Sequence, residues 1–302
     1  MIGNAETIAE MLGPKVDISS LDNEISRSKV TTLAFELYKE AIRVLNLGAC
    51  ILDRASSASG GLSRNQAICA ALLIRMVKFM IAVLDLTCKN DRGEVVLSLN
   101  RSIMESAFDL EFLVRADDDK HYDDFVKNSL GAERESYDLV QANIAKRGND
   151  IVLPIEKRIL RSLDRLCEVS GVKIEDVHPK WSSWAGGLKQ RLQFLQKEEQ
   201  YVFMHRLPSN AVHGTWVDLY KQHLDYNPQT KRFMPRSKWR PTDARVYGPT
   251  GVLVLDAVKP YVEKFFSTII SHAILIFLRY SRFRSYLHRF LLYADISVSE
   301  KI

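Results

Sequence analysis

The chain has 302 residues, of which 46% are hydrophobic and 26% charged, and 42 Lys and Arg against 37 Asp and Glu give a net charge of +5. This composition is typical of a globular protein and excludes a low-complexity chain. With only 14 Gly and 9 Pro residues, a mainly β-structured chain is also disfavoured. The four cysteines lie far apart without C-x-x-C spacing, so we expect reduced thiols and a cytoplasmic location.

Neither end of the chain predicts a membrane segment. Residues 1–27 are polar and weakly periodic, lack the basic and apolar regions of a secretory signal, and are predicted to form an arm. The most apolar stretch, residues 265–278, is shorter than the roughly 20 residues that cross a bilayer. We therefore expect no integral membrane span, and residues 294–302 are predicted to be a tail.

Helical periodicity dominates the first half of the chain. Apolar residues recur at three- and four-residue steps from 29 to 54 and predict a helix. The small residues at 56–61 predict a connector, after which Ser63 is the expected N-cap of a second helix that ends near Cys88. That helix is apolar nearly all round, so we expect it to be central. A third helix is predicted over 94–115.

Five more helices are predicted in the rest of the chain. Acidic residues 117–119 suit the first turn of a helix over 119–146, and Pro154 and Gly171 bound the next one. Helices over 188–206 and 208–223 are separated by Pro208, which disfavours helical geometry at Leu207. Residues 225–250 are predicted to be a long basic loop without regular structure, followed by a helix over 252–293.

The fold class is therefore all-α. We expect a bundle of about seven to nine helices, with a long Pro-rich loop before the C-terminal helix, in a single domain of residues 28–293. The common motifs for nucleotide phosphates, dinucleotides, zinc proteases and serine hydrolases are missing. Because the histidines show no cluster with cysteines or carboxylates, we expect no metal site and no cofactor.

The first candidate site feature is the pair Arg101 and Glu105, which share a helical stripe with Phe108 and Phe112. Arg before Glu at this spacing is the less favourable order for surface stabilisation, and an ion pair beside an apolar face costs desolvation unless other groups satisfy it. Two interpretations stay open. The pair fixes the helix register against a polar group elsewhere, or Arg101 presents its charge to an anionic ligand or orients a histidine.

The second feature is the segment around His213, which follows Ser209 by one helical turn. We place Gly214 in mid-helix, where glycine costs about 1 kcal/mol relative to alanine, and such a glycine indicates the close approach of another backbone or a ligand. His213 is then either a packed core histidine or one that contacts a ligand or substrate.

These residues carry a resemblance that covers roughly residues 65–290. The chain resembles a broad bacterial family of all-helical domains of unknown function, and the resemblance implies the fold but no established activity. The matching residues are Arg101, Glu105, Trp184, Tyr201, Ser209, His213 and Gly214.

Arg206 and His213 carry a more distant resemblance. Their spacing matches the Arg-x(4–6)-His motif of the higher-eukaryote-and-prokaryote nucleotide-binding superfamily, many members of which are metal-independent ribonucleases. The resemblance implies a histidine that moves the 2′-hydroxyl proton and a cation that stabilises the charge on phosphorus. Leu207 stands where that superfamily usually has a polar residue, and Pro208 is expected to place Arg206 outside the helix of His213.

The third feature is the basic loop, in which Lys and Arg alternate with aromatic residues. Such a mixture can contact phosphates and stack on unpaired bases; the alternative is a solvated loop whose aromatic rings pack onto the bundle. The candidate substrate-binding residues are Ser209, Asn210, Arg232, Arg236, Lys238, Trp239 and Arg240.

We therefore expect a metal-independent ribonuclease-like or nucleic-acid-binding protein of toxin or phage-defence type. His213 is its general acid or base, Arg206 or Arg101 stabilises phosphate charge, and Glu105 orients one of these groups. The competing hypothesis is a non-catalytic interaction or sensor module in which Arg101, Glu105 and His213 form an internal polar network; a small-ligand sensor using this cluster is a third. The expected partners are RNA, a second copy of the chain and a protein partner.

Overall fold

The computed structural model describes residues 27–90, 92–148, 151–178, 184–240, 242 and 244–265. Outside these residues lie 1–26 of the predicted N-terminal arm, 266–278 of the apolar stretch 265–278, the rest of the last predicted helix and the C-terminal tail. The described chain packs as two compact units. The first contains the described residues up to Arg115 and from Lys197 onward, and the second is Ala116–Gln196. This division reports packing and not independent folding, so the single domain stays a prediction.

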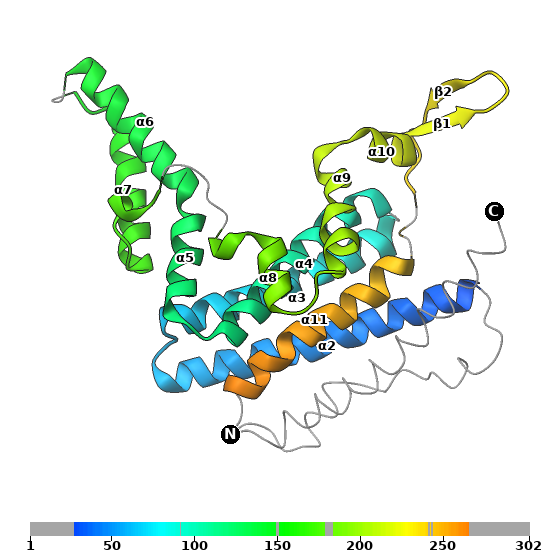
Figure 1. Ribbon diagram of the computed structural model, residues 1–302, viewed down its shortest axis with the longest axis horizontal. Coiled ribbons are helices and arrows are strands. Elements are labelled where there is room, and N and C mark those ends of the chain that lie inside the picture. Colours follow the sequence, from blue (N-terminus) through cyan, green and yellow to red (C-terminus); the bar gives the residue numbers. More distant parts are fainter. Residues whose placement is uncertain are drawn as a thin grey trace. The chain divides into compact units, whose positions relative to one another are not determined.

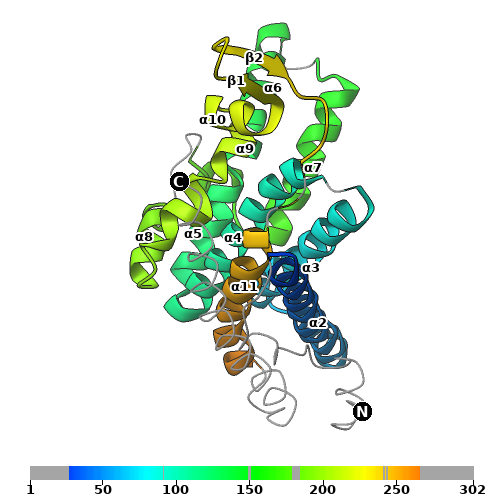
Figure 2. The same cartoon turned by 90° about the vertical axis from the view of Figure 1, so that its right-hand side faces the viewer.

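Long helices form the core of the first unit, and the all-α prediction is confirmed. They are α2 (Arg27–Ser59), α3 (Arg64–Asn90), α4 (Gly93–Ala116) and α11 (Ala244–Phe265). Helix α11 lies alongside α2 (Figures 1 and 2). Tyr247 of α11 is buried there, with its ring edge-on to Phe35 and Tyr38 of α2 at centroid distances of 5.4 and 5.5 Å. Its hydroxyl donates to Thr87 of α3 at 2.9 Å, so one side chain links three segments of the core.

Helix α3 begins where the sequence predicts. The Ser63 hydroxyl accepts a hydrogen bond from the Gln66 backbone (3.5 Å), while the Gln66 side chain accepts one from the Ser63 backbone (3.0 Å), which is a capping box. Cys69, Leu73 and Met76 are completely buried, whereas Ile74 and Ile81 are exposed. Among the described residues α3 therefore packs through one face and is not enclosed on all sides as predicted.

Helix α3 is also, among the described helices, the one long and apolar enough to cross a membrane by length and composition. The buried core helix of a globular protein has the same two properties, so this is weak evidence for a span. The burial of one face of α3 is consistent with the expectation of no integral membrane span.

Two predicted boundaries in this region are wrong. The small residues 56–59 continue α2, because serine and alanine are tolerated in helices; the chain leaves the helix at Gly60 (φ 77°) and Gly61 (φ 128°). The predicted helix 119–146 is two helices, α5 (Asp119–Ser129) and α6 (Gly131–Arg147). The predicted role of the acidic residues at the start of the helix is confirmed, since the Asp118 side chain caps α5 by accepting a hydrogen bond from the Lys120 backbone at 3.0 Å.

The second unit contains α5, α6, α7 (Pro154–Ser170), η2 (Ile174–Asp176), η3 (Trp184–Gly186) and α8 (Leu188–Phe194). Helix α7 has Pro154 in its first turn and the left-handed Gly171 (φ 65°) at its end, as predicted. Trp184 is buried between the Phe125 ring (5.2 Å) and the Arg191 guanidinium (4.2 Å above the ring). Trp184 is therefore part of the core of this unit.

The chain around Pro208 departs from the prediction. The expected helix 188–206 ends at Phe194, because Gln196 takes a left-handed conformation (φ 57°). A π-helical turn, η4 (Val202–Arg206), then leads into α9 (Ser209–His213). Leu207 has helical angles (φ −67°, ψ −45°), and its N–H donates to the Val202 carbonyl at 2.9 Å.

The hydrogen bond between Leu207 and Val202, five residues apart, explains why the prediction for Leu207 is wrong. A proline inside an α-helix cannot donate the usual backbone hydrogen bond and clashes with the preceding turn, and here the chain before Pro208 is a π turn, not an α-helical one. Pro208 therefore does not exclude helical geometry at Leu207. The other part of the prediction is confirmed, because Arg206 lies in η4 and His213 lies in α9.

Gly214 does not lie in mid-helix. It is the left-handed residue (φ 56°) that ends α9, and a Cβ atom built on it would meet no atom within 4 Å. The glycine is therefore explained by its backbone conformation and not by the close approach of another group. Two short segments follow, α10 (Trp216–Asp218) and the π turn η5 (Leu219–His223).

The predicted irregular loop contains regular structure. Strands β1 (Leu224–Asn227) and β2 (Arg232–Pro235) form an antiparallel hairpin in which Tyr226 pairs with Phe233. Helix α11 begins at Ala244 and contains Pro249 and Pro260. Each proline removes one backbone hydrogen bond, but packing of the helix against its neighbours supplies most helical stability, and α11 packs against α2.

A buried ion pair lies at the point where the chain re-enters the first unit, after residue 196. Glu111 of α4 has a fully buried side chain, and Lys197 donates to its Oε2 atom at 2.6 Å. Arg115 Nη2 lies 3.0 Å from the other carboxylate oxygen. Because a buried carboxylate is stable when it is paired, this contact fixes the start of the segment that continues into η4 and α9.

We expect Lys197→Met to lower the free energy of unfolding by about 3 kcal/mol, because it leaves a buried carboxylate with one partner fewer. Chemical denaturation would measure the loss. The matched control is Lys189→Met, at an exposed lysine. Adding Glu111→Leu to Lys197→Met should recover most of the stability; a loss no larger than that of the control would contradict a role for this pair.

Candidate functional site

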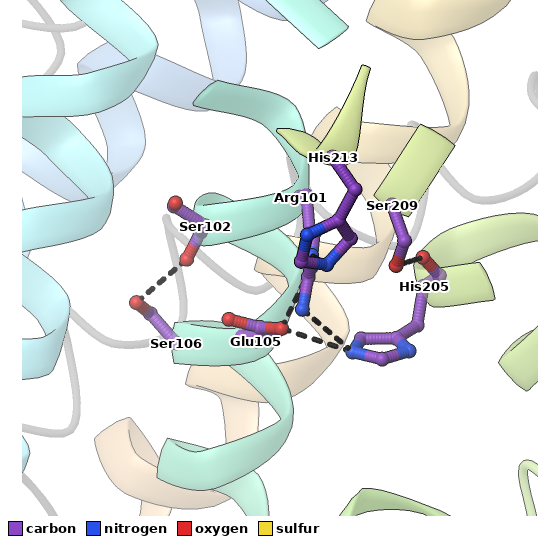
Figure 3. A network of polar contacts seen from close by, with 7 residues as sticks. All are labelled: Arg101, Ser102, Glu105, Ser106, His205, Ser209 and His213. Carbon is purple, nitrogen blue, oxygen red and sulfur yellow. Dashed lines mark hydrogen bonds and ion pairs between the residues drawn. The ribbon is translucent and has the colours of Figure 1, made fainter. Parts of the chain in front are cut away.

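Arg101 of α4 is the centre of a polar cluster with Glu105, His205 and His213 (Figure 3). Its Nε atom donates to Glu105 Oε1 at 3.0 Å. Its Nη1 atom lies 3.4 Å from His213 Nε2, and its Nη2 atom lies 3.4 Å from His205 Nε2. The structure thus brings together three of the four predicted catalytic residues, Arg101, Glu105 and His213, and adds His205.

His205 is held on several sides. Its Nε2 atom lies 3.0 Å from Glu105 Oε1, and its ring stacks on Tyr201 at 5.3 Å with an angle of 23°. A carboxylate can only accept, so Nε2 carries a proton and donates to Glu105. The approach of Arg101 Nη2 to the same nitrogen is then a close contact and not a hydrogen bond. Nδ1 is buried and has no hydrogen-bond partner among the described residues.

His213 has a different environment. Its side chain is exposed, and Nε2 faces Arg101 Nη1, a group that can only donate. In the neutral ring Nε2 is therefore the acceptor and Nδ1 carries the proton. The Nε2 lone pair lies beside a permanent cation at the solvent-exposed part of the cluster, where an anionic group could contact both.

The spacing of the histidines explains why they face the same guanidinium. His205, Ser209 and His213 are separated by four residues each, which places them on one face of a helical segment. The Ser209 hydroxyl donates to the His205 carbonyl at 2.6 Å and links the two turns. Sequence reasoning missed His205 and Tyr201 as partners, although the four-residue steps to His205 were a usable signal.

Arg206 does not join the cluster. Its side chain is exposed and makes no hydrogen bond or ion pair with a described side chain. Neighbouring residues of a helical segment point about 100° apart, so Arg206 and His205 cannot both face Arg101. Asn210, a predicted substrate-binding residue, accepts a hydrogen bond from the Thr215 hydroxyl at 2.9 Å and bridges the end of α9.

Among the predicted substrate-binding residues of the basic loop, Arg236 and Arg240 are held by hydrogen bonds to other residues, while most of the side chains are exposed. Arg236 donates to Asp225 and, at 2.9 Å, to the Leu224 carbonyl, so it fastens the hairpin. The hydrogen bond from Arg236 also lowers the pKa of Asp225. Arg240 is fastened through its backbone, which bonds Gly93 and Glu94 at 2.9 and 3.1 Å. The side chains of Arg232, Lys238, Trp239 and Arg240 are exposed.

The electrostatics of the cluster favour an ionised Glu105. Burial by itself raises the pKa of this carboxyl group, but the hydrogen bond from His205 and the charge and hydrogen bond of Arg101 outweigh burial and lower the pKa. Glu105 is therefore an anion at neutral pH that orients two other groups. In the described part of the chain, no three His, Cys, Asp or Glu side chains are arranged to hold a metal ion.

We expect Glu105 to stabilise the fold in a pH-dependent way. A carboxyl group whose pKa is lower in the folded state contributes stability above its unfolded pKa of about 4.3, and this contribution disappears as the pH falls through the folded pKa. The difference in unfolding free energy between the wild type and Glu105→Gln should thus be larger at neutral pH than in acid. Denaturation across this pH range, with the exposed Glu198→Gln as the control, would measure it, and a constant difference would contradict the pairing.

Comparison with known proteins places the chain in a family. No curated protein and no solved structure matches it. A family model described as a family of unknown function, DUF5677, matches residues 66–231, which is more than half of the chain and includes the whole polar cluster. The resemblance to an uncharacterised family is therefore confirmed, over a shorter range than predicted. The chain belongs to DUF5677, a family of unknown function.

Proposed function

We propose that the protein is a metal-independent ribonuclease whose reaction takes place at Arg101 and His213. The observation that carries the proposal is the contact of one guanidinium with the Nε2 atom of an exposed histidine. A base and a permanent cation facing the same point are the two groups that phosphodiester cleavage without metal needs. Arg101 takes the role that the sequence spacing assigned to Arg206.

Each group has a defined part in the reaction. When substrate binds, its phosphate takes the hydrogen bond of Arg101 Nη1 in place of His213. The freed His213 Nε2 accepts the proton of the 2′-hydroxyl, and the 2′-oxygen forms a bond to phosphorus. Arg101 stabilises the negative charge that builds on the phosphate oxygens. The bond from phosphorus to the 5′-oxygen breaks, and that oxygen takes a proton from solvent. The products are a 2′,3′-cyclic phosphate and a 5′-hydroxyl.

Glu105 and His205 act as positioning residues in this scheme. Glu105 accepts from Arg101 Nε, which leaves the Nη atoms pointing at His213 and at the incoming phosphate. His205 donates to the same carboxylate oxygen and holds it from the other side. The stacked Tyr201 ring restricts rotation of His205, so the guanidinium is fixed before a substrate arrives.

We expect His213→Ala to lower kcat/KM for a fluorogenic RNA oligonucleotide by about 10²- to 10⁴-fold, which is the usual contribution of a general base. Arg101→Ala should cause a loss of similar size. The assay contains a chelator, and a substrate with 2′-deoxyribose at the cleavage position should not be cut. Because His213 is exposed, His213→Ala should change the unfolding free energy by no more than about 0.5 kcal/mol.

Arg206→Ala is the matched control for Arg101→Ala. It removes an arginine from the His213 segment, but that arginine does not touch the cluster, so the cleavage rate should be retained. Loss of cleavage in Arg206→Ala with full activity in Arg101→Ala would overturn the assignment from geometry. Full activity in His213→Ala would overturn the proposed site.

A second candidate function is a non-catalytic interaction or sensor module. It is favoured by the low exposure of the Arg101 and His205 side chains, 19% each, and by their shared bond to Glu105. An internal network of this kind stabilises the fold and contributes nothing to a reaction. If the wild type cleaves no RNA while Arg101→Ala and His205→Ala lower the melting temperature, this candidate replaces the ribonuclease.

A further inference from the structure

Four aromatic rings gather on the surface directly after His213. We call them the aromatic platform: Trp216, Tyr220, Tyr226 and Phe233. Phe233 of β2 meets Trp216, Tyr220 and Tyr226 at centroid distances of 5.5, 6.2 and 4.9 Å. Trp216 and Tyr220 lie nearly parallel, 6.2 Å apart with an angle of 20°. The rings contact one another and join the hairpin to α10 and η5. Figure 1 shows the hairpin directly after this part of the chain.

The platform stays open to solvent although it is aromatic. Trp216 is 59% exposed, Phe233 45%, and Tyr220 and Tyr226 42% each. No residue of α9, α10 or η5 is buried, so these rings are not part of the core of the first unit. A cluster of large exposed apolar side chains marks an interaction site more often than chance exposure does.

The charges around the platform indicate what it binds. Residues 216–240 contain six Lys and Arg residues and two acidic residues. One of the acidic residues, Asp225, is already paired with Arg236. Five basic side chains of this segment are exposed: Lys221, Lys231, Arg232, Lys238 and Arg240. A partner that matches both features has negative charge at short intervals and flat apolar faces.

We propose that the aromatic platform binds an unpaired strand of nucleic acid. Bases stack on the exposed ring faces, led by Trp216, while Lys231 and Arg232 at the tip of the hairpin contact phosphates. Stacking does not require a particular base, so binding should tolerate many sequences. A duplex hides its base faces and offers phosphates alone, and it should bind more weakly. The inference rests on the proposed function, because it locates the substrate strand, but its test measures binding alone.

The experiment uses the full chain and a fluorescein-labelled dT12 oligonucleotide in fluorescence anisotropy. This strand has no 2′-hydroxyl and cannot be cleaved by the proposed reaction. Trp216→Ala should weaken binding by about 5- to 100-fold, which corresponds to the loss of one base stack, whereas Trp216→Phe keeps a ring and should retain most of the affinity. The control Phe194→Ala removes a ring of similar exposure, 53%, from the second unit and should have no effect.

A charge variant tests the phosphate contacts without altering the platform rings. Lys231→Glu combined with Arg232→Glu should weaken binding and reduce the slope of log affinity against log salt by about 1.4, since each contact to a single strand contributes about 0.7. The matched control is Lys157→Glu with Arg158→Glu, two exposed basic residues of α7. Circular dichroism melting shows that each variant is folded.

Three results would overturn the proposal. The first is equal affinity for the single strand and for a duplex. The second is that Trp216→Ala and the Lys231→Glu, Arg232→Glu double variant both bind the strand as tightly as the wild type. The third is that Trp216→Ala dissociates a dimer in sedimentation without changing the affinity for the strand. The last result would make the platform a contact between copies. Strand binding by a wild type that cleaves no RNA would keep this inference and overturn the proposed function.

Discussion

The buried pair of Glu111 and Lys197 is the contact on which the site depends. Glu111 lies on α4, the helix that also carries Arg101 and Glu105, and its carboxylate is fully buried. Lys197 is the first residue of the segment that returns to the first unit. Because a carboxylate at this depth is unfavourable with one partner fewer, the contact fixes the segment to α4 at this point, and η4 and α9 follow from there with His205 and His213.

The polar cluster is organised by the geometry of one guanidinium. Arg101 presents its Nε atom to Glu105 on its own helix and its two Nη atoms to histidines on another segment. A lysine in this position could not do this, because its charge is a single point without a planar fork. The two histidines are not equivalent. His205 is enclosed by Glu105 and Tyr201, whereas His213 is exposed and its acceptor nitrogen faces the cation.

The segment from Trp216 to Arg240 exposes a cluster of aromatic rings in contact with one another. The aromatic residues Tyr38, Phe108 and Tyr247 of the long helices are buried, while this segment leaves its aromatic rings in solvent among exposed basic side chains. The family model covers the cluster and the hairpin as far as residue 231. In the function that we propose, the aromatic platform captures a flexible polyanion and the polar cluster cuts it.

Local sequence signals determined much of the fold. Helical periodicity, the N-caps Ser63 and Asp118, and Gly171 at the end of α7 depend on neighbouring residues, so they could be predicted without the tertiary structure. The pairing of Arg101 with Glu105, one turn apart, belongs to the same class. The π turn before Pro208, the hairpin and the helical prolines of α11 could not be predicted, because packing against other elements decides them. Tertiary structure alone also decided that His205, and not Arg206, meets Arg101, since the direction of a side chain depends on how its segment is anchored.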